Sequence, residues 1–355
     1  MTKMKLNEQI QEELLDIIKK NSNNKNYKLP SERLLATKFN ASRPTIRAAY
    51  QKLIQQGYVE GVHGKGYFIK NDAKSSLKNQ VKLHLLFIVP SLKTTLMQQI
   101  YSGIMDFCEE NNIELSIKIT DGIPKKEKQI LELAFYSHYD GLILFPIDNE
   151  YYNETLLKIS ISKYPIVLID RYIKALNLSF VSTDNYNAMI NVIKYLHSKQ
   201  YKNPVFVTHE TSLATTVEER VSGYNTGLLK CYRKIKNTNL LILKSNDRDY
   251  VYKTIKDFIQ NNPEIDALII TDVYLSTAYS AITELNISVP EKLRFIVFDN
   301  EVSFAERKAI HPYIIEQDGR NIGYSAAHCV YNQIMGDKRI QTKKFPVEII
   351  GDEND

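Results

Sequence analysis

From about residue 82 onward, apolar runs of strand length alternate with amphipathic segments of ten or more residues. This alternation restricts the possible folds more than any other feature of the chain. The runs LHLLFIV at 83–89, GLILF at 141–145 and PIVLI at 165–169 are nearly continuously apolar, unlike a strand that exposes one face. Strands of this kind, separated by helices, are typical of parallel sheets that helices cover on both faces. The sequence therefore predicts an α/β fold.

The same pattern gives the order of the elements. Strands are expected at 83–89, 113–119, 141–145, 165–169, 204–208, 239–243, 266–271, 293–298, 313–316 and 345–350. Helices are expected at 96–111, 125–137, 151–162, 186–199, 216–230, 249–261, 274–286 and 319–334. A polar stretch at 199–203 interrupts the series, so we expect a domain over 82–355 with two similar lobes rather than one sheet.

Polar side chains follow many of these strands. In open parallel sheets, ligands bind at the carboxyl ends of the strands. The Asp, Asn, Gln, Thr and Arg residues found there can exchange hydrogen bonds with a polyhydroxylated ligand, and Tyr172 or Phe304 could stack on a sugar face. Because such residues also form turns and cap helices, no single one decides the matter. As a set they favour a ligand cleft.

The first 70 residues follow a different pattern, in which helices precede two short strands. Residues 5–20 place apolar side chains on one helical face. Two further helices follow, and their caps, intervening turn and end are marked by Ser31, Asn40–Ala41, Ser42, Pro44 and Gly57. Strands are expected at Tyr58–Val62 and Tyr67–Ile69. This order predicts a winged helix-turn-helix in residues 1–70, and the polar residues 71–81 are expected to form a linker.

Basic side chains gather in this small unit. Residues 1–70 hold 13 Lys or Arg and 6 Asp or Glu, a net charge of +7, whereas the whole chain carries +5. A solvated surface could account for the excess, but in a winged helix-turn-helix it favours contact with DNA phosphates. The start of the third helix, the start of the second and the hairpin tip are the parts expected to meet DNA. The candidate DNA-binding residues are Arg33, Ser42, Arg43, Thr45, Arg47, His63, Gly64 and Lys65.

The motifs LPSER, SRPTIR, QQGYVE and HGKGYFI, in this order and spacing, resemble the DNA-binding domain of the GntR family of bacterial regulators. The resemblance covers about residues 5–70. It implies DNA contacts from Arg33, Arg43, Thr45, Arg47, Gly64 and Lys65. Pro44 stands where the family often has Thr, so one phosphate contact is in question.

Residues 82–350 resemble the sugar-binding effector domain of the lactose/galactose-repressor family, which is itself similar to periplasmic sugar-binding proteins. The resembling segments include FIVPSL, DGLILFP, PIVLIDR, ERVSGYNTGL and EQDGRNIG. The family usually has Asn where this chain has Thr271. The resemblance implies ligand contacts from Ser91, Arg171, Asp184, Arg220, Thr271, Asp299 and Gln317. Asp272, which follows Thr271, is added to these candidate effector-binding residues. Fusions of the two parts resemble regulators of the arabinose-repressor type.

Enzyme motifs are missing from the sequence. A GntR-like head can precede an aminotransferase-like domain that uses pyridoxal phosphate, but the space is too short and no Schiff-base Lys is apparent. There is no nucleophile elbow, P-loop or Gly-rich dinucleotide loop, and the seven histidines show no metal-ligand spacing. We therefore expect no cofactor, no metal and no catalysis, although a kinase or hydrolase acting on sugar stays open.

The expected compartment is the cytoplasm. The N-terminus lacks the pattern of a signal peptide, no apolar run suggests a membrane span, and Cys108, Cys231 and Cys329 show no pairing pattern. We expect a regulator, a repressor rather than an activator, that binds a palindromic operator in double-stranded DNA as a homodimer. Its expected effector is a monosaccharide. The alternative is a phosphosugar or nucleobase, although a phosphate would find only Arg171 and Arg220 at the strand ends.

Overall fold

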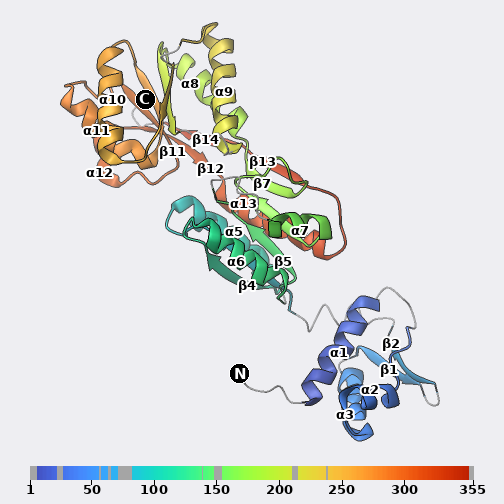
Figure 1. Cartoon of the computed structure of the whole chain (residues 1–355). Coiled ribbons are helices and arrows are strands. Elements are labelled where there is room, and N and C mark those ends of the chain that lie inside the picture. Colours follow the sequence, from blue (N-terminus) through green and yellow to red (C-terminus); the bar gives the residue numbers. More distant parts are fainter. Residues whose placement is uncertain are drawn as a thin grey trace. The chain divides into compact units, whose positions relative to one another are not determined.

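The computed structural model describes residues 6–21, 27–55, 57–62, 65–70, 82–137, 139–147, 154–209, 215–236 and 239–351. Contacts divide the chain into two units, Met1–Lys82 and Leu83–Asp355 (Figure 1). Each unit has its own apolar core. The linker predicted at 71–81 lies outside the described residues.

The N-terminal unit, called the head below, has the predicted order of elements. It consists of α1 (Leu6–Asn21), α2 (Glu32–Phe39), α3 (Arg43–Gln55), β1 (Val59–Val62) and β2 (Gly66–Ile69). The side chain of Ser31 caps α2 by accepting the Leu34 N–H at 3.3 Å, and Asn40 takes a left-handed conformation with φ 46° in the turn. One face of α1 packs on α2, α3 and the hairpin through Ile10, Leu14 and Ile18. The head is therefore a winged helix-turn-helix.

The C-terminal unit contains two six-stranded sheets. The sheet of lobe 1 is entirely parallel and has the order β13-β7-β6-β5-β3-β4. Its strands are β3 (His84–Val89), β4 (Glu114–Ile119), β5 (Gly141–Leu144), β6 (Ile166–Ile169), β7 (Ser179–Thr183) and β13 (Thr342–Phe345). Its helices are α5 (Thr95–Glu110), α6 (Pro124–Phe135), α7 (Glu154–Ser162) and α13 (Gly319–Ile334).

The sheet of lobe 2 has the order β14-β12-β11-β10-β8-β9, and only β14 is antiparallel to its neighbour. Its strands are β8 (Pro204–His209), β9 (Leu240–Leu243), β10 (Ala267–Thr271), β11 (Arg294–Phe298), β12 (Tyr313–Gln317) and β14 (Val347–Ile350). Its helices are α8 (Asn185–Ser198), α9 (Thr215–Tyr232), α10 (Arg248–Asn261), α11 (Asp272–Glu284) and α12 (Phe304–Ile310). Helices cover both faces of each sheet (Figure 1), so the predicted architecture is confirmed.

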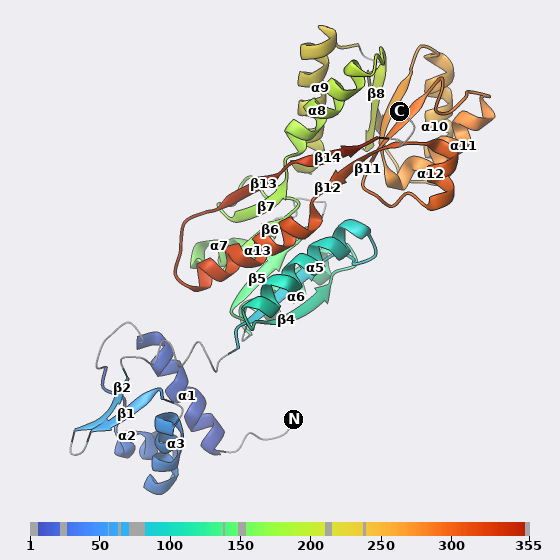
Figure 2. The ribbon, with the colours of Figure 1, turned by 180° about the vertical axis from the view of Figure 1, so that it is seen from behind.

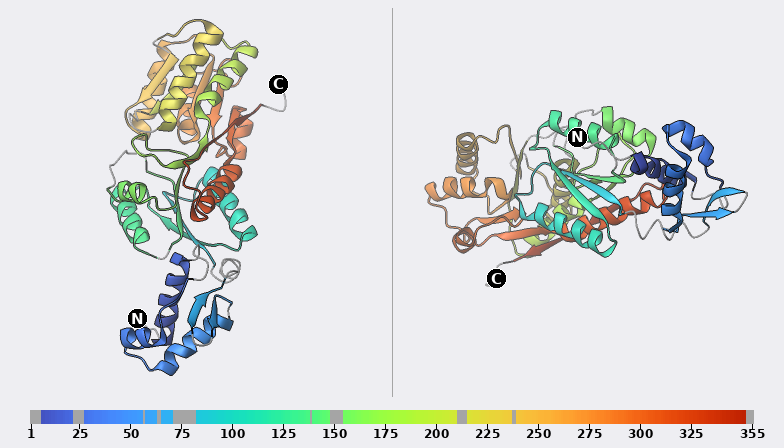
Figure 3. Two further views of the ribbon diagram at one scale, coloured as in Figure 1. Left: turned by 90° about the vertical axis from the view of Figure 1, so that its right-hand side faces the viewer. Right: turned by 90° about the horizontal axis from the view of Figure 1, so that it is seen from below.

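The division of the chain between the lobes differs from the prediction. The chain crosses between lobes after β7, after β12 and at Pro346, so the boundary predicted at 199–203 is wrong. Helix α8 precedes that stretch yet packs with α9 in the core of lobe 2, and α13 returns to pack on α5 in lobe 1 (Figure 3). An apolar helical face shows that a helix is buried, but it does not show which sheet buries it.

The last predicted strand, 345–350, corresponds to β14 with a later start, but the prediction missed the separate strand β13 that precedes it. β13 joins β7 in lobe 1, and β14 joins β12 in lobe 2, with Pro346 between them (Figure 2). Proline lacks the N–H that a continuous strand would need at this point. Two further short elements, β7 and α12, also have no counterpart among the predicted strands and helices. The seven residues of α12 depend on a capping box, in which Ser303 and Glu306 satisfy each other's backbone N–H groups.

Candidate functional site

The head presents most of its predicted DNA-binding residues on the surface. Arg33, Ser42, Arg43, Arg47 and Lys65 are exposed. Thr45 is half-buried beside Ser42, and the two hydroxyl oxygens lie 2.8 Å apart at the start of α3. His63 and Gly64 lie outside the described residues. Cationic and hydroxyl groups therefore lie at the start of α3, the end of a recognition helix that contacts base edges in helix-turn-helix proteins.

Arg47 has a partner that sequence reasoning missed. Its Nε and Nη2 donate to the two carboxylate oxygens of Glu32, each at 3.0 Å. The Tyr67 hydroxyl donates to Glu32 Oε1 at 2.7 Å, and the Tyr67 ring stacks on Tyr50 with 3.8 Å between centroids. The hydrogen bonds from Arg47 and then Tyr67 lower the pKa of Glu32, so the carboxylate is ionised at neutral pH. The residues are 15 and 35 positions apart, and no local pattern reveals the contact.

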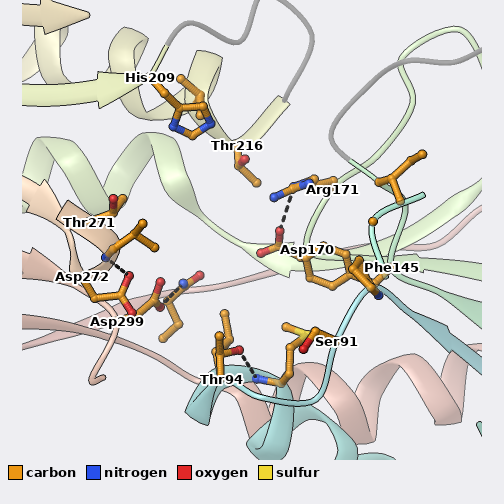
Figure 4. Close-up of a pocket in the computed structure, with 18 of the residues that line it drawn as sticks. Ser91, Thr94, Phe145, Asp170, Arg171, His209, Thr216, Thr271, Asp272 and Asp299 are labelled. Carbon is orange, nitrogen blue, oxygen red and sulfur yellow. Dashed lines mark hydrogen bonds and ion pairs between the residues drawn. The ribbon is translucent and has the colours of Figure 1, made fainter. Parts of the chain in front are cut away.

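A cavity of about 490 Å³ lies between the two lobes (Figure 4). Residues that follow strands of lobe 1 face residues that follow strands of lobe 2 across it. All the predicted effector residues except Asp184 line this cleft, namely Ser91, Arg171, Arg220, Thr271, Asp272, Asp299 and Gln317. The expectation that strand ends converge on one site therefore agrees with the geometry.

Asp184 lies elsewhere. It is the N-cap of α8, where it accepts the Asn187 N–H at 3.2 Å and the Asn187 side-chain amide at 2.7 Å. It lines a separate groove that also contains Tyr172. Tyr172 stacks on Phe180, with 4.3 Å between centroids, and Phe304 is 73% exposed on α12, so neither predicted stacking residue lines the cleft. The prediction for Asp184 was wrong because a helix cap and a ligand contact have the same sequence signature.

The two arginines of the cleft, Arg220 and Arg171, have different interaction partners. The Arg220 Nε donates to Asn185 Oδ1 at 2.7 Å, and its guanidinium lies 3.9 Å from the centroid of the Phe298 ring. Burial lowers the pKa of Arg220, and the carboxylates of Asp299 and Asp170 oppose that shift. Arg171 lies on the lobe 1 side, with its Nε 3.4 Å from Asp170. Arginine stays protonated in such surroundings, so the cleft holds two fixed positive charges.

Three aspartates face these arginines. Burial raises the pKa of Asp299, which accepts a hydrogen bond from Gln317 Nε2 at 2.5 Å. Burial and the nearby Asp299 raise the pKa of Asp272 to about 6. With Asp170 they give the cleft more carboxylates than guanidinium groups, together with several hydroxyl and amide groups. This composition suits a ligand that donates many hydrogen bonds and carries no strong negative charge.

Sequence reasoning left out several lining residues. Asp170 directly follows β6 and His209 ends β8, so strand-end position marks both, although the candidate effector residues do not include them. Phe145 forms part of the apolar wall near Arg171, with 5.1 Å between the guanidinium carbon and the ring centroid. Asn246 and Thr216 come from a loop and a helix start without a recognisable pattern.

Two further properties bear on the class of protein. No helix within the described ranges is long and apolar enough to cross a membrane. The part of the chain that the structure describes also contains no group of three or more His, Cys, Asp or Glu side chains that could hold a metal ion.

Family models match almost the whole chain. Residues 82–351 match the model described as periplasmic binding proteins and sugar binding domain of LacI family. Residues 6–69 match the model described as bacterial regulatory proteins, gntR family. Both matches agree with the resemblances stated above.

Two curated relatives match about three quarters of this chain. The HTH-type transcriptional regulator KdgR of Bacillus subtilis is 24% identical over 74% of this chain and 78% of its own length. The arabinose metabolism transcriptional repressor of Halalkalibacterium halodurans is 22% identical over 77% of this chain and 74% of its own length.

Solved structures agree on the fold of the C-terminal unit. Transcription regulator CcpA of Lactococcus lactis matches with a TM-score of 0.65 and 16% identity, over 76% of this chain and 98% of that one. A LacI transcriptional regulator from Lactobacillus brevis matches with a TM-score of 0.63 and 19% identity, over 75% and 99%. At these identities the likeness concerns the fold alone.

Proposed function

The chain belongs to the family of periplasmic binding proteins and LacI-type sugar-binding domains and is a transcriptional regulator of the hybrid GntR/LacI type. We propose that it is a repressor whose operator affinity falls when a neutral monosaccharide occupies the cleft. The observation that carries the proposal is the lining of the cleft, in which both lobes contribute polar strand-end residues. A sugar that touches both lobes would stabilise one arrangement of them.

The charge of the cleft supports a neutral sugar over a phosphosugar. Arg171 and Arg220 are the cations in the described lining, and each has a carboxylate nearby. A phosphate dianion would therefore meet carboxylates whose charge opposes its own. A nucleobase is the remaining alternative, since Phe145 and Tyr274 offer aromatic surface.

The proposed protein is a cytoplasmic homodimer that binds a palindromic operator. One winged helix makes few base contacts, and two heads related by a two-fold axis would read both half-sites. In this proposal the head spans residues 1–70, the segment 71–81 connects it, and the effector domain spans 82–355. An effector that lowers operator affinity 100-fold supplies roughly 3 kcal/mol of coupling, which is common for allosteric proteins.

A ligand screen tests the proposal. Pentoses, hexoses, deoxysugars, their phosphates and free nucleobases are tested for thermal stabilisation of the full chain, where a ligand at 100 times its Kd adds about 2.7 kcal/mol. The ligand that binds is then added to a complex with operator DNA, which is obtained by selecting bound duplexes from a random pool. We expect a neutral sugar to stabilise the protein and release the DNA.

Two results would contradict the proposal: stabilisation only by phosphates or nucleobases, or a bound sugar that leaves operator affinity unchanged. Chromatography of the sugar after long incubation tests the enzymatic alternative. Recovery of the unchanged sugar is expected, whereas a phosphorylated or cleaved product would indicate catalysis.

A further inference from the structure

Three side chains from three different elements of the head form one hydrogen-bonded unit. Glu32 is the first residue of α2, Arg47 lies in α3 and Tyr67 lies in β2 of the wing. Glu32 accepts from two nitrogens of Arg47 at 3.0 Å and from the Tyr67 hydroxyl at 2.7 Å. The Glu32 side chain is 18% exposed and that of Arg47 is 61% exposed, so the carboxylate is inside and the guanidinium outside.

The bond pattern determines which edge of the guanidinium faces outward. Glu32 takes the Nε hydrogen and one Nη2 hydrogen of Arg47. The other edge, made of Nη1 and the second Nη2 hydrogen, is directed away from Glu32. Arginine commonly reads guanine in the major groove with two parallel N–H groups on O6 and N7. The outward edge, which does not bond to Glu32, carries the two parallel N–H groups that such a contact needs.

Tyr67, which donates to Glu32, is itself fixed by contacts with its neighbours. The Tyr67 ring is stacked on Tyr50, with an interplanar angle of 6°, and the Tyr50 hydroxyl donates to the carbonyl of Pro30 at 2.5 Å. Pro30 is separated from Glu32 by one residue, so the network closes on the segment that starts α2. A guanidinium held in this way loses less conformational freedom when it binds a base than a freely rotating one does.

We propose that Glu32 is a positioning residue for DNA recognition, which holds Arg47 with its outward edge ready for a base while Tyr67 couples the wing to this arrangement. The proposal rests on the proposed DNA-reading role of the head. It distinguishes Arg47 from Arg33 and Arg43, for which the described residues give no carboxylate hydrogen bond of this kind.

The test compares specific with non-specific binding by the full chain. The specific probe is a duplex selected by the wild-type protein from a random pool, and the non-specific probe is the same duplex with its half-sites scrambled. The measured quantity is the ratio of the two affinities at one salt concentration, because phosphate contacts alone give salt-dependent affinity without specificity.

For Glu32→Ala we expect the affinity ratio to fall at least about 10-fold, through weaker operator binding. Non-specific affinity should stay equal or rise, since a negative charge has been removed. Glu32→Gln keeps an acceptor for Arg47 and should recover part of the ratio. Adding Glu32→Ala to Arg47→Ala should lower the ratio little further, because both changes remove the same contact.

Glu13→Ala is the matched control. Glu13 forms the other described carboxylate ion pair of the head, with Lys38 Nζ at 2.6 Å, and its loss removes the same charge without touching Arg47. We expect this variant to keep the wild-type ratio.

Results other than the expected ones would contradict either the inference or the proposed function. A higher operator affinity for Glu32→Ala would show that Glu32 competes with DNA for Arg47, and equal loss of both affinities would show a merely structural role. Either result, or an unchanged ratio, overturns the inference. A wild-type protein that selects no sequence at all would instead overturn the proposed function.

Discussion

Glu127 is a buried carboxyl group outside the cleft lining, in the first turn of α6. Its side chain accepts the N–H of Ile147 at 3.0 Å, and Ile147 forms part of the cleft wall. Only 6% of the residue is exposed, and burial raises its pKa to about 7. The protonated carboxyl therefore fits this position better than the carboxylate does.

This shift predicts a pH dependence of stability. A carboxyl whose pKa is higher in the folded state stabilises the fold when it is protonated, below its ordinary value of 4.5, and the advantage is lost as pH rises through about 7. We expect Glu127→Gln to be more stable than the wild type at pH 8 by roughly 1–3 kcal/mol, and by little at pH 5. Calorimetry at both pH values measures this difference. A constant difference between the proteins would show that Glu127 does not titrate in this window.

Asp272 lines the cleft at the start of α11. Its Oδ1 accepts the adjacent Val273 N–H at 2.7 Å, so amide replacement disturbs the fold less than loss of Arg220 would. If the effector donates a hydrogen bond to this carboxylate, Asp272→Asn should weaken effector binding by about 1.5–3 kcal/mol and leave DNA affinity without effector unchanged.

The same replacement at the exposed Asp249 of α10 should affect neither affinity. Titration calorimetry with the sugar found by the screen gives the comparison. Wild-type effector affinity in Asp272→Asn would remove this residue from the binding site.

Helices α5 and α13 pack closely because a glycine of each helix lies against the backbone of the other. A Cβ added at Gly323 would lie 1.9 Å from the Ile100 carbonyl oxygen, and one added at Gly103 would lie 1.9 Å from that of Arg320. Any side chain there forces the helices apart, since backbone atoms cannot yield as a flexible side chain can.

We therefore expect Gly323→Ala to lower the free energy of unfolding by about 1–3 kcal/mol or more. Ser102→Ala, at a half-buried site on α5, should change it by less than about 0.5 kcal/mol. Urea unfolding of the full chain measures both values. Similar stability of the two variants would mean that the helices separate without cost.

Periodicity identified nearly all the helices and strands, but it could not determine how they assemble. Helix α8 and helix α13 have the apolar faces that the sequence indicates, yet each belongs to the lobe opposite to the one expected from chain order. Strand-end position placed most of the candidate effector residues in the cleft because parallel strands end at one edge. It failed for Asp184 because the same carboxylate caps a helix. The Glu32–Arg47 contact depends on how α2 and α3 are packed, which no spacing in the sequence encodes.

Within the C-terminal unit, residues near the crossings between lobes form contacts beside the cleft. Thr183 Oγ1 at the end of β7 donates to Gln317 Oε1 at 2.5 Å, and Gln317 in turn donates to Asp299. A second contact between the lobes involves Glu219 on α9 of lobe 2. Its Oε1 lies 2.5 Å from Lys344 Nζ of lobe 1 and accepts a hydrogen bond from the Tyr172 hydroxyl at 2.9 Å. A ligand that touches both lobes stabilises one arrangement of them. The contacts between lobes that exist in this arrangement therefore affect how tightly the ligand binds.

The Glu219 contacts should strengthen effector binding, because they exist in the arrangement in which both lobes line the cleft. Neutralising Glu219 lowers the population of that arrangement, and the apparent affinity falls with the population. Since Glu219 is 17% exposed and Lys344 32%, we expect Glu219→Gln to weaken effector binding about 3- to 10-fold, or about 1 kcal/mol. Glu218→Gln removes a pair with Lys174 whose side chains are 62% and 52% exposed, and it should change the affinity less than about 2-fold. Calorimetric titration of both variants decides the matter. Equal losses would indicate a general effect of charge on α9, and no loss in either would mean that the ion pairs do not favour the ligand-binding arrangement.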